Sequence, residues 1–212
     1  DMAIIGAHLI RDLPEEYKIY AEKDFTFNKI KQNNRNGLLW DKSIQVDGIK
    51  TGHTDKAGYN LVASATNANN MRLISVVMGV PTIKGREVES KKLLQWGFAN
   101  FDTFKTLEAG KAISEQSVYY GDMGKVSLGV LQDGFITIPK GKQTELKARY
   151  ELNKKYLQAP LAKGEVVGQV VYQLEGKDIA KIDLQVMQEV QEGGIFGKAW
   201  DWLVLTVKSL FD

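Results

Sequence analysis

The stretch that decides the fold is VDGIKTGHTDKAGYNL, residues 46–61. Residues 49–54 follow the turn dipeptide Asp47-Gly48 and have the composition of a short strand. Lys56-Ala57-Gly58 turns the chain, and residues 60–66 predict a second strand. The connection between the two strands is short, which indicates a hairpin.

Working outward, a third strand is predicted at residues 71–78, after the turn cluster of residues 67–70. Because parallel strands need long crossovers, three strands joined this closely must form an antiparallel meander. Pro81 ends the meander, and residues 86–101 predict a helix. Its apolar residues at helical spacing are Leu94, Phe98 and Phe101. Strands followed by a helix that packs back on them predict an α+β domain.

The segment before the meander predicts an amphipathic helix, with Met2, Ile5 and Leu9 on one face and Pro14 at its end. Residues 15–31 show no clear period. The start of the chain has neither the charged region nor the cleavage pattern of a signal peptide. Since a domain rarely begins inside a helix without a cap, we expect further residues before Asp1.

From about Thr106 onward, short runs of alternating apolar and polar residues are separated by Gly-containing turns. Residues 166–174 and 179–187 predict a hairpin across Gly176. Many short strands with regular turns are typical of a small β-sandwich or barrel. We therefore predict a first domain at residues 1–104, a β-sandwich domain at 105–192 and a separate segment at 193–212.

That last segment predicts a helix from Ile195 to Asp212, after a flexible joint at Gly193-Gly194. Its broad apolar face contains Ile195, Phe196, Ala199, Trp200, Trp202, Leu203, Val204, Thr206, Val207, Leu210 and Phe211. Leu205 falls on the opposite face, with Lys198, Asp201, Lys208, Ser209 and Asp212. The helix is too interrupted by charges to span a bilayer. Its apolar face fits either a core contact or a membrane interface, where tryptophan is favoured.

Composition excludes several classes of protein. The formal net charge is +2, and no basic stripe with interleaved aromatics is present, so we expect no nucleic-acid partner. The absence of cysteine excludes disulfides, thiolate metal sites and a cysteine nucleophile. Two histidines are too few for a multi-histidine zinc site. We therefore predict neither a metal nor a cofactor.

The tripeptide Lys50-Thr51-Gly52 is the first candidate for chemistry. A lysine beside a hydroxyl is a good receptor for a carboxylate, because charge-assisted hydrogen bonds are strong. Gly52 leaves one side of the strand open, so that a ligand backbone could approach closely. A tripeptide recurs by chance, however, and a lysine on an edge strand is usually only solvated.

Residues 46–61 as a whole closely resemble the third active-site motif of low-molecular-mass penicillin-binding proteins, the D-alanyl-D-alanine carboxypeptidases of the 5/6 type. The likeness continues through residues 34–40, 85–87 and 90–94, the β-rich domain and the terminal helix. It implies the C-terminal part of a serine β-lactamase/D,D-peptidase-like domain. A small β-sandwich and a helix that anchors the protein to the inner-membrane surface would follow.

The resemblance implies six candidate site residues: Lys50, Thr51, Gly52, His53, Arg35 and Arg86. Lys50 and Thr51 would bind the terminal carboxylate of a D-Ala-D-Ala peptide or of a β-lactam. The backbone N–H of His53 would form half of the oxyanion hole. Arg35 and Arg86 match arginines near the carboxylate subsite, and their alternative role is that of ordinary surface or ion-pair residues.

The same resemblance predicts what the chain lacks. The family uses the motifs Ser-x-x-Lys, Ser-x-Asn and Lys-Thr-Gly, and only the third is present. The other two belong upstream of Asp1 and include the nucleophile and its base. We therefore expect this chain alone to be inactive.

Two hypotheses follow for function. In the first, the chain is part of a serine-type carboxypeptidase that removes the terminal D-alanine from peptidoglycan stem peptides and binds penicillin. It would lie at the periplasmic face of the inner membrane and attach peripherally through residues 195–212. In the second, it is a non-catalytic, membrane-associated β-domain module that positions a partner or a wall polymer.

Overall fold

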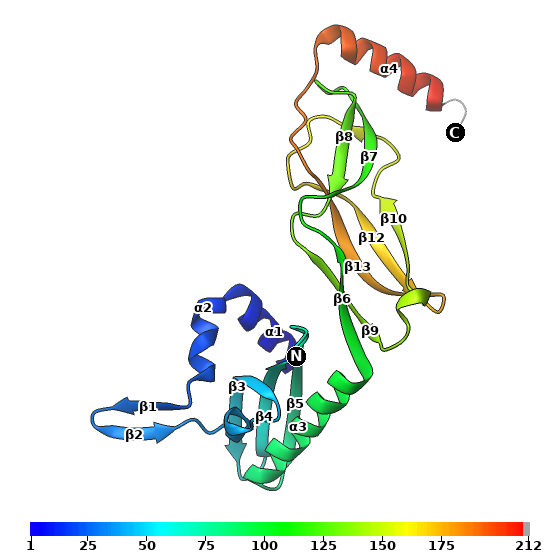
Figure 1. Cartoon of the computed structure of the whole chain (residues 1–212). Coiled ribbons are helices and arrows are strands. Elements are labelled where there is room, and N and C mark those ends of the chain that lie inside the picture. The colour runs from blue at the N-terminus through cyan, green and yellow to red at the C-terminus, as the bar shows by residue number, and fades with distance from the viewer. Residues whose placement is uncertain (210–212) are drawn as a thin grey trace. The chain divides into compact units, whose positions relative to one another are not determined.

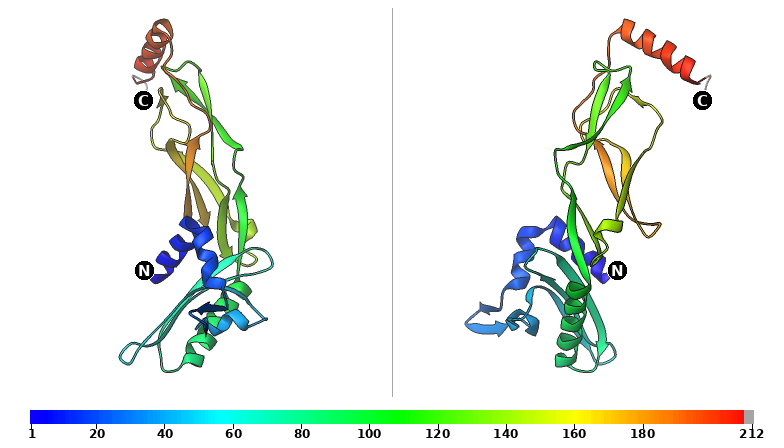
Figure 2. Two further views of the ribbon diagram at one scale, coloured as in Figure 1. Left: turned by 90° about the vertical axis from the view of Figure 1, so that its left-hand side faces the viewer. Right: turned by 45° about the vertical axis from the view of Figure 1, so that its right-hand side comes forward.

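The computed structural model describes residues 1–209 and the side chains of residues 1–208 (Figures 1 and 2). The chain divides into two compact units, Asp1–Asp102 and Thr103–Asp212. Each unit has its own hydrophobic core. The boundaries expected after residues 104 and 192 stay predictions.

The first unit is built on the three strands expected from the sequence. β3 (Gln45–Thr54), β4 (Gly58–Thr66) and β5 (Arg72–Val80) form an antiparallel sheet in the order β3-β4-β5. The pairing of β3 with β4 runs from Gln45 opposite Thr66 to Thr54 opposite Gly58. The predicted meander is confirmed, and β3 is an edge strand of this sheet.

Helices cover both faces of the sheet because its strands alternate apolar side chains between two clusters. Leu61, Ala63 and Ala65 pack with Leu94 of α3 (Ile83–Asn100), which lies along the sheet in Figure 1. On the other face, Ile49 and Val62 pack with α1 (Met2–Asp12) and Tyr17. α3 begins three residues before the predicted residue 86, because the side chain of Thr82 accepts a hydrogen bond from the Gly85 N–H.

Between α1 and the sheet the chain is more regular than the sequence predicts. Pro14 opens a further helical turn, since proline fits the first position of a helix. The segment contains α2 (Pro14–Tyr17), η1 (Lys18–Ala21), β1 (Asp24–Phe27), β2 (Ile30–Asn33) and η2 (Gly37–Trp40). β1 and β2 form an antiparallel hairpin that extends away from the sheet in Figure 1. No pattern in the sequence had predicted this hairpin.

The second unit contains most of the strands. They are β6 (Phe101–Leu107), β7 (Ala112–Tyr119), β8 (Lys125–Gly129), β9 (Gly134–Pro139), β10 (Lys147–Leu152), β11 (Leu157–Gln158), β12 (Val166–Leu174) and β13 (Lys177–Val186), with η3 (Gln143–Glu145) before β10. Six of them form one sheet in the order β10-β12-β13-β8-β7-β11, and β6 pairs with β9. The hairpin predicted across Gly176 is confirmed. Fully buried residues such as Val126, Leu128 and Leu184 form the core.

The last element is α4 (Ile195–Ser209), which matches the helix predicted from Ile195 onward. Within the described residues, no helix is long and apolar enough to cross a membrane. Most large apolar side chains of α4 are exposed: Ile195, Phe196, Trp200, Trp202, Leu203 and Val207 are 46–92% exposed. Val204 and Leu205 are partly buried. Leu210, Phe211 and Asp212, which the prediction included, lie outside the described residues.

Candidate functional site

The end of β3 lines a cavity of about 500 Å³. Its walls are formed by Arg35, Thr51, Gly52, His53, Tyr59, Ile83 and Arg86. Five of the six residues singled out from the sequence therefore meet at one place, although they come from a loop, a strand and a helix. Their roles stay predictions.

Lys50, the sixth, is not among the lining residues. It lies directly before Thr51 on the strand, where successive side chains point to opposite faces. Its ammonium group is exposed and donates to the Thr51 carbonyl oxygen at 2.7 Å. Because the side chain is long and exposed, this contact is easily exchanged for another acceptor.

Gly52 leaves open space beside the strand. A Cβ added there would meet only the Cβ of Asn60, at 3.8 Å, which is an ordinary contact. The fold therefore does not require glycine at this position. The close approach of a ligand backbone at Gly52 stays a prediction.

His53 and Tyr59 face each other across the hairpin. They are register partners, and their rings stack with the centroids 3.9 Å apart. Tyr59 was not among the residues expected at the site, although its pairing with His53 follows from an antiparallel hairpin whose turn is Lys56-Ala57-Gly58. The stacked pair forms one wall of the cavity.

Arg86 joins the walls of the cavity. It is only 4% exposed, and its guanidinium donates to the carbonyl oxygens of Arg35 (3.0 Å), Gly52 (3.4 Å) and Asn60 (3.5 Å). Its central carbon also lies 5.7 Å from the ring centroid of Tyr59. Among the described residues, its buried Nε has no hydrogen-bond partner. Arg86 thus fixes the positions of three backbone segments, whereas the side chain of Arg35 is exposed.

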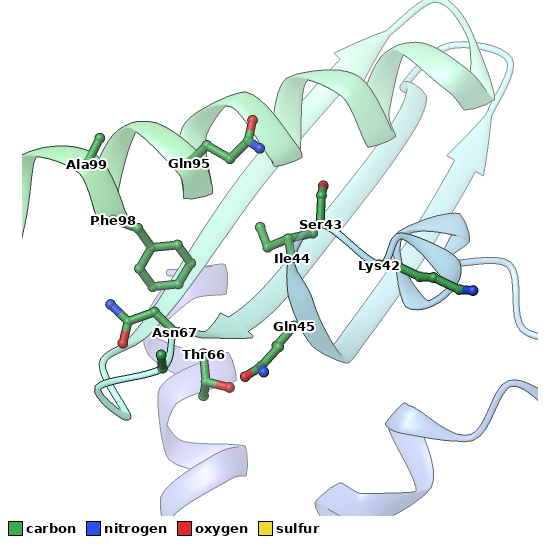
Figure 3. Close-up of a pocket in the computed structure, with 10 residues that line it drawn as sticks. Lys42, Ser43, Ile44, Gln45, Thr66, Asn67, Gln95, Phe98 and Ala99 are labelled. Atoms are coloured by element: carbon green, nitrogen blue, oxygen red, sulfur yellow. The ribbon is translucent and has the colours of Figure 1, made fainter.

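A second cavity of about 490 Å³ lies at the opposite end of the sheet (Figure 3). Its polar lining includes Gln45, Thr66, Asn67 and Gln95, with Phe98 of α3 beside Asn67. None of the six candidate residues lines it. In residues 1–209, no group of three or more histidine, aspartate or glutamate side chains could hold a metal ion.

Two protein families match the two parts of the chain. The family described as D-alanyl-D-alanine carboxypeptidase matches residues 1–82, and the penicillin-binding protein 5 C-terminal domain matches residues 101–192. The chain is thus similar to the C-terminal part of a penicillin-binding D-alanyl-D-alanine carboxypeptidase. This confirms the resemblance drawn from residues 46–61 and the predicted α+β fold with an appended β-domain.

Two curated proteins and one solved structure are similar to this chain in sequence. D-alanyl-D-alanine carboxypeptidase DacA of Haemophilus influenzae is 81% identical over 211 residues, which are 100% of this chain and 54% of the relative. DacA of Escherichia coli K12 is 59% identical, over 100% of this chain and 52% of the relative. The crystal structure of penicillin binding protein 5 from Haemophilus influenzae matches with a TM-score of 0.80 at 80% identity, over 90% of this chain and 56% of that one. The chain thus spans about half the length of the curated relatives it matches.

A hydrogen-bonded network holds β3 in place on the N-terminal side of Lys50. Asn36, which is 2% exposed, donates to the Gly48 carbonyl at 2.9 Å. Tyr17 donates to Asp47 at 2.8 Å, and Asp47 also pairs with Arg72 at 2.7 Å. Burial, together with the Asp47 carboxylate, raises the pKa of Tyr17 above its ordinary value, so its hydroxyl keeps its proton. These contacts fix β3 just before Lys50, and no sequence period pointed to them.

Proposed function

We propose that this chain supplies the carboxylate-binding strand of a serine-type D-alanyl-D-alanine carboxypeptidase. The observation that carries the proposal is the cavity at the end of β3, where Thr51, Gly52, His53, Arg35 and Arg86 meet. The names of the relatives indicate the reaction. Because the chain covers about half of those relatives, the remaining catalytic groups belong to a longer protein.

In this proposal, Lys50 exchanges the Thr51 carbonyl for the terminal carboxylate of a stem peptide that ends in D-Ala-D-Ala, and the Thr51 hydroxyl donates to the same group. The His53 N–H donates to the carbonyl oxygen under attack. A serine outside this chain attacks that carbonyl, D-alanine leaves, and water then hydrolyses the acyl-enzyme. A β-lactam presents an equivalent carboxylate and is attacked in the same way.

Labelled penicillin tests this proposal in an extended protein, in which the part of the Haemophilus influenzae relative upstream of this match is joined to residues 1–212. The extended protein should gain the mass of one penicillin, and the chain alone should gain none. Lys50→Ala should slow acylation by about 10- to 100-fold, the equivalent of one charge-assisted hydrogen bond of about 1.5–3 kcal/mol.

Lys125→Ala, which removes an exposed lysine on β8, is the matched control and should acylate at the parent rate. An unchanged rate in Lys50→Ala would remove that residue from the carboxylate site. An extended protein that gains no adduct would instead favour the non-catalytic module, which positions a partner or wall polymer.

We also propose that α4 lies on the surface of the inner membrane, on its periplasmic side. The support is the outward-facing apolar side of α4, which includes Trp200 and Trp202. Exposed apolar residues on one helix face, with tryptophan among them, are typical of helices in a membrane interface. Such a helix attaches a protein peripherally and does not span the bilayer.

Deletion of residues 195–212 tests the anchor. The truncated protein should no longer float with vesicles of phosphatidylethanolamine and phosphatidylglycerol, while the melting temperature of the β-domain stays nearly unchanged. The reason for the unchanged melt is that the apolar face of α4 contributes no buried core. Flotation that survives the deletion would refute the anchor.

A further inference from the structure

α4 turns its polar side toward the β-domain. Lys198, Asp201, Leu205 and Lys208 lie within an arc of about 80° on the helix, at 3.6 residues per turn. We call the three charged residues of this arc the polar stripe. Asp201 and the neighbouring Leu205 are partly buried, whereas the large apolar residues on the opposite side are exposed. A helix that packs on a soluble domain through its apolar face would show the reverse pattern.

The central contact of the polar stripe is made by Asp201. Its carboxylate accepts a hydrogen bond from the backbone N–H of Tyr120 at 2.6 Å. Tyr120 follows directly after β7 and has a φ of 63°, which non-glycine residues adopt rarely. Hydrogen bonds from a backbone N–H to a carboxylate are stronger than those between neutral groups. This bond therefore joins α4 to the end of β7.

Two further contacts lie on either side of Asp201. Lys198 pairs with Glu192, which precedes the helix. Near the other end, the Lys208 ammonium donates to the Tyr119 hydroxyl at 2.8 Å and lies 5.7 Å from the ring centroid of Tyr156. The rings of Tyr119 and Tyr156 pack edge to face, with their centroids 5.7 Å apart. The stripe is thus held at points spread along the helix.

The segment before α4 is fixed as well, and this corrects the expectation of a flexible joint at Gly193-Gly194. The Gly193 N–H donates to the Tyr120 carbonyl at 2.8 Å, and Glu192 pairs with Gly121 as a β-bridge. A Cβ added at Gly193 would overlap the carbonyl of Gly121. Gly193 is therefore required by a close backbone contact. Of these two glycines, Gly194 is the one that has open space around it.

We infer that the polar stripe latches α4 onto the β-domain, so that the outward apolar face is presented to a lipid bilayer in one fixed orientation. Asp201 is the positioning residue of this latch. This inference rests on the proposed membrane attachment for the function of the latch. The contacts that form the latch do not depend on that proposal. A helix that served only as a flexible tether would need none of the contacts to Tyr119 and Tyr120.

The absence of cysteine makes the latch testable by spin labelling of the full chain. Labels are attached at Thr206→Cys on α4 and Lys181→Cys on β13, both exposed positions. Distances between them are measured by pulsed electron paramagnetic resonance, first in solution and then on phosphatidylethanolamine–phosphatidylglycerol vesicles. The parent should give a single narrow distance peak in both conditions.

Asp201→Ala should lose that narrow peak, and Asp201→Asn, which keeps an acceptor oxygen, should retain it. Glu189→Ala removes an exposed carboxylate from the segment before α4 and should leave the peak narrow. Lys208→Met tests the outer contact and should broaden the peak. A broad distribution in the parent, or an Asp201→Ala peak as narrow as that of the parent, would overturn the latch.

Flotation separates this inference from the membrane proposal. Asp201→Ala keeps its apolar face and should still float with the vesicles. A parent that shows the narrow peak but does not float would refute the anchor and leave the latch standing. A parent that floats with a broad peak would refute only the latch.

Discussion

Gly48 and Gly52 lie on the same strand but have opposite surroundings. A Cβ at Gly48 would lie 2.5 Å from the hydroxyl oxygen of Tyr17, whereas one at Gly52 would make only an ordinary contact. Gly48→Ala should therefore destabilise the first unit by about 1–3 kcal/mol through overpacking. Gly52→Ala should leave the melting temperature unchanged but slow penicillin acylation of the extended protein.

Each glycine variant is the control for the other, because both add one methyl group to β3. Thermal melts and acylation rates measured on both proteins separate a structural effect from a ligand effect. If Gly52→Ala acylates at the parent rate, the open space beside Gly52 is not where a ligand approaches.

At the scale of elements, an ion pair joins the end of η2 to α3. The Lys91 ammonium lies 2.6 Å from the Asp41 carboxylate, which also accepts from the Ser43 hydroxyl at 2.7 Å. The Lys91 ammonium, and to a smaller extent the Ser43 hydroxyl, holds the pKa of Asp41 well below its usual range because each donates a hydrogen bond to the carboxylate. A carboxyl group whose pKa is lowered in the folded state stabilises the fold at pH values above its unfolded-state pKa. This contribution is lost as the pH falls toward the folded-state pKa.

Asp41→Asn should therefore lower the melting temperature at pH 7 by about 2–4 °C. The difference between parent and variant should shrink as the pH falls below about 4, where the unfolded carboxyl group takes up its proton. Melts of both proteins between pH 3 and 7 measure this. A difference that stays constant across that range would show that the charge of Asp41 is not responsible. Glu89→Gln, at an exposed pair with Lys92 on α3, is the control and should change little.

The sequence predicted those elements in which the turn residues and the spacing of apolar residues indicate the same secondary structure. Lys56-Ala57-Gly58 separates β3 from β4, and the hairpin at Gly176 has glycine where φ is positive. Asp47-Gly48, expected as a turn before the strand, instead lies inside β3 at a shift of the pairing register. The β1–β2 hairpin was missed because every residue of both strands is exposed, so no alternation marks a buried face. Its turn uses Asn28 and Lys29, both with positive φ, and lysine is an unusual residue there.

Local sequence pattern predicted the site only where it is contiguous, whereas Arg35 and Arg86 were reached through the family resemblance. Thr51, Gly52 and His53 belong to one motif, and Tyr59 could have been added from the register of the hairpin. The contacts of Asn36 with Gly48 and of Tyr17 with Asp47 join segments that no local pattern relates. The strand order of the β-domain was equally inaccessible, since β11 pairs in parallel with β7 although β8, β9 and β10 lie between them in the sequence.

At the scale of the whole molecule, the β-domain has its own core and should fold without the first unit. A protein of residues 103–192 should show a cooperative thermal melt and a β-type circular dichroism spectrum. Leu184→Ala, at a fully buried position, should destabilise it by about 2–5 kcal/mol.

Lys181→Ala, at an exposed position on the same strand, is the control for that variant and should melt with the parent. A disordered spectrum for residues 103–192 would contradict the independence of the domain. A melt that is unaffected by Leu184→Ala would show that the transition does not report the core.

The carbonyl contacts of Arg86 have a thermodynamic consequence. They join Arg35, Gly52 and Asn60 to α3, so the cavity exists only while the first unit is folded. Because its walls are ordered before a ligand arrives, little conformational entropy is lost on binding. A ligand that binds only the folded unit also shifts the folding equilibrium toward that state, by an amount that grows with the logarithm of its concentration. Occupancy of the cavity and resistance to heat are therefore linked quantities in this protein.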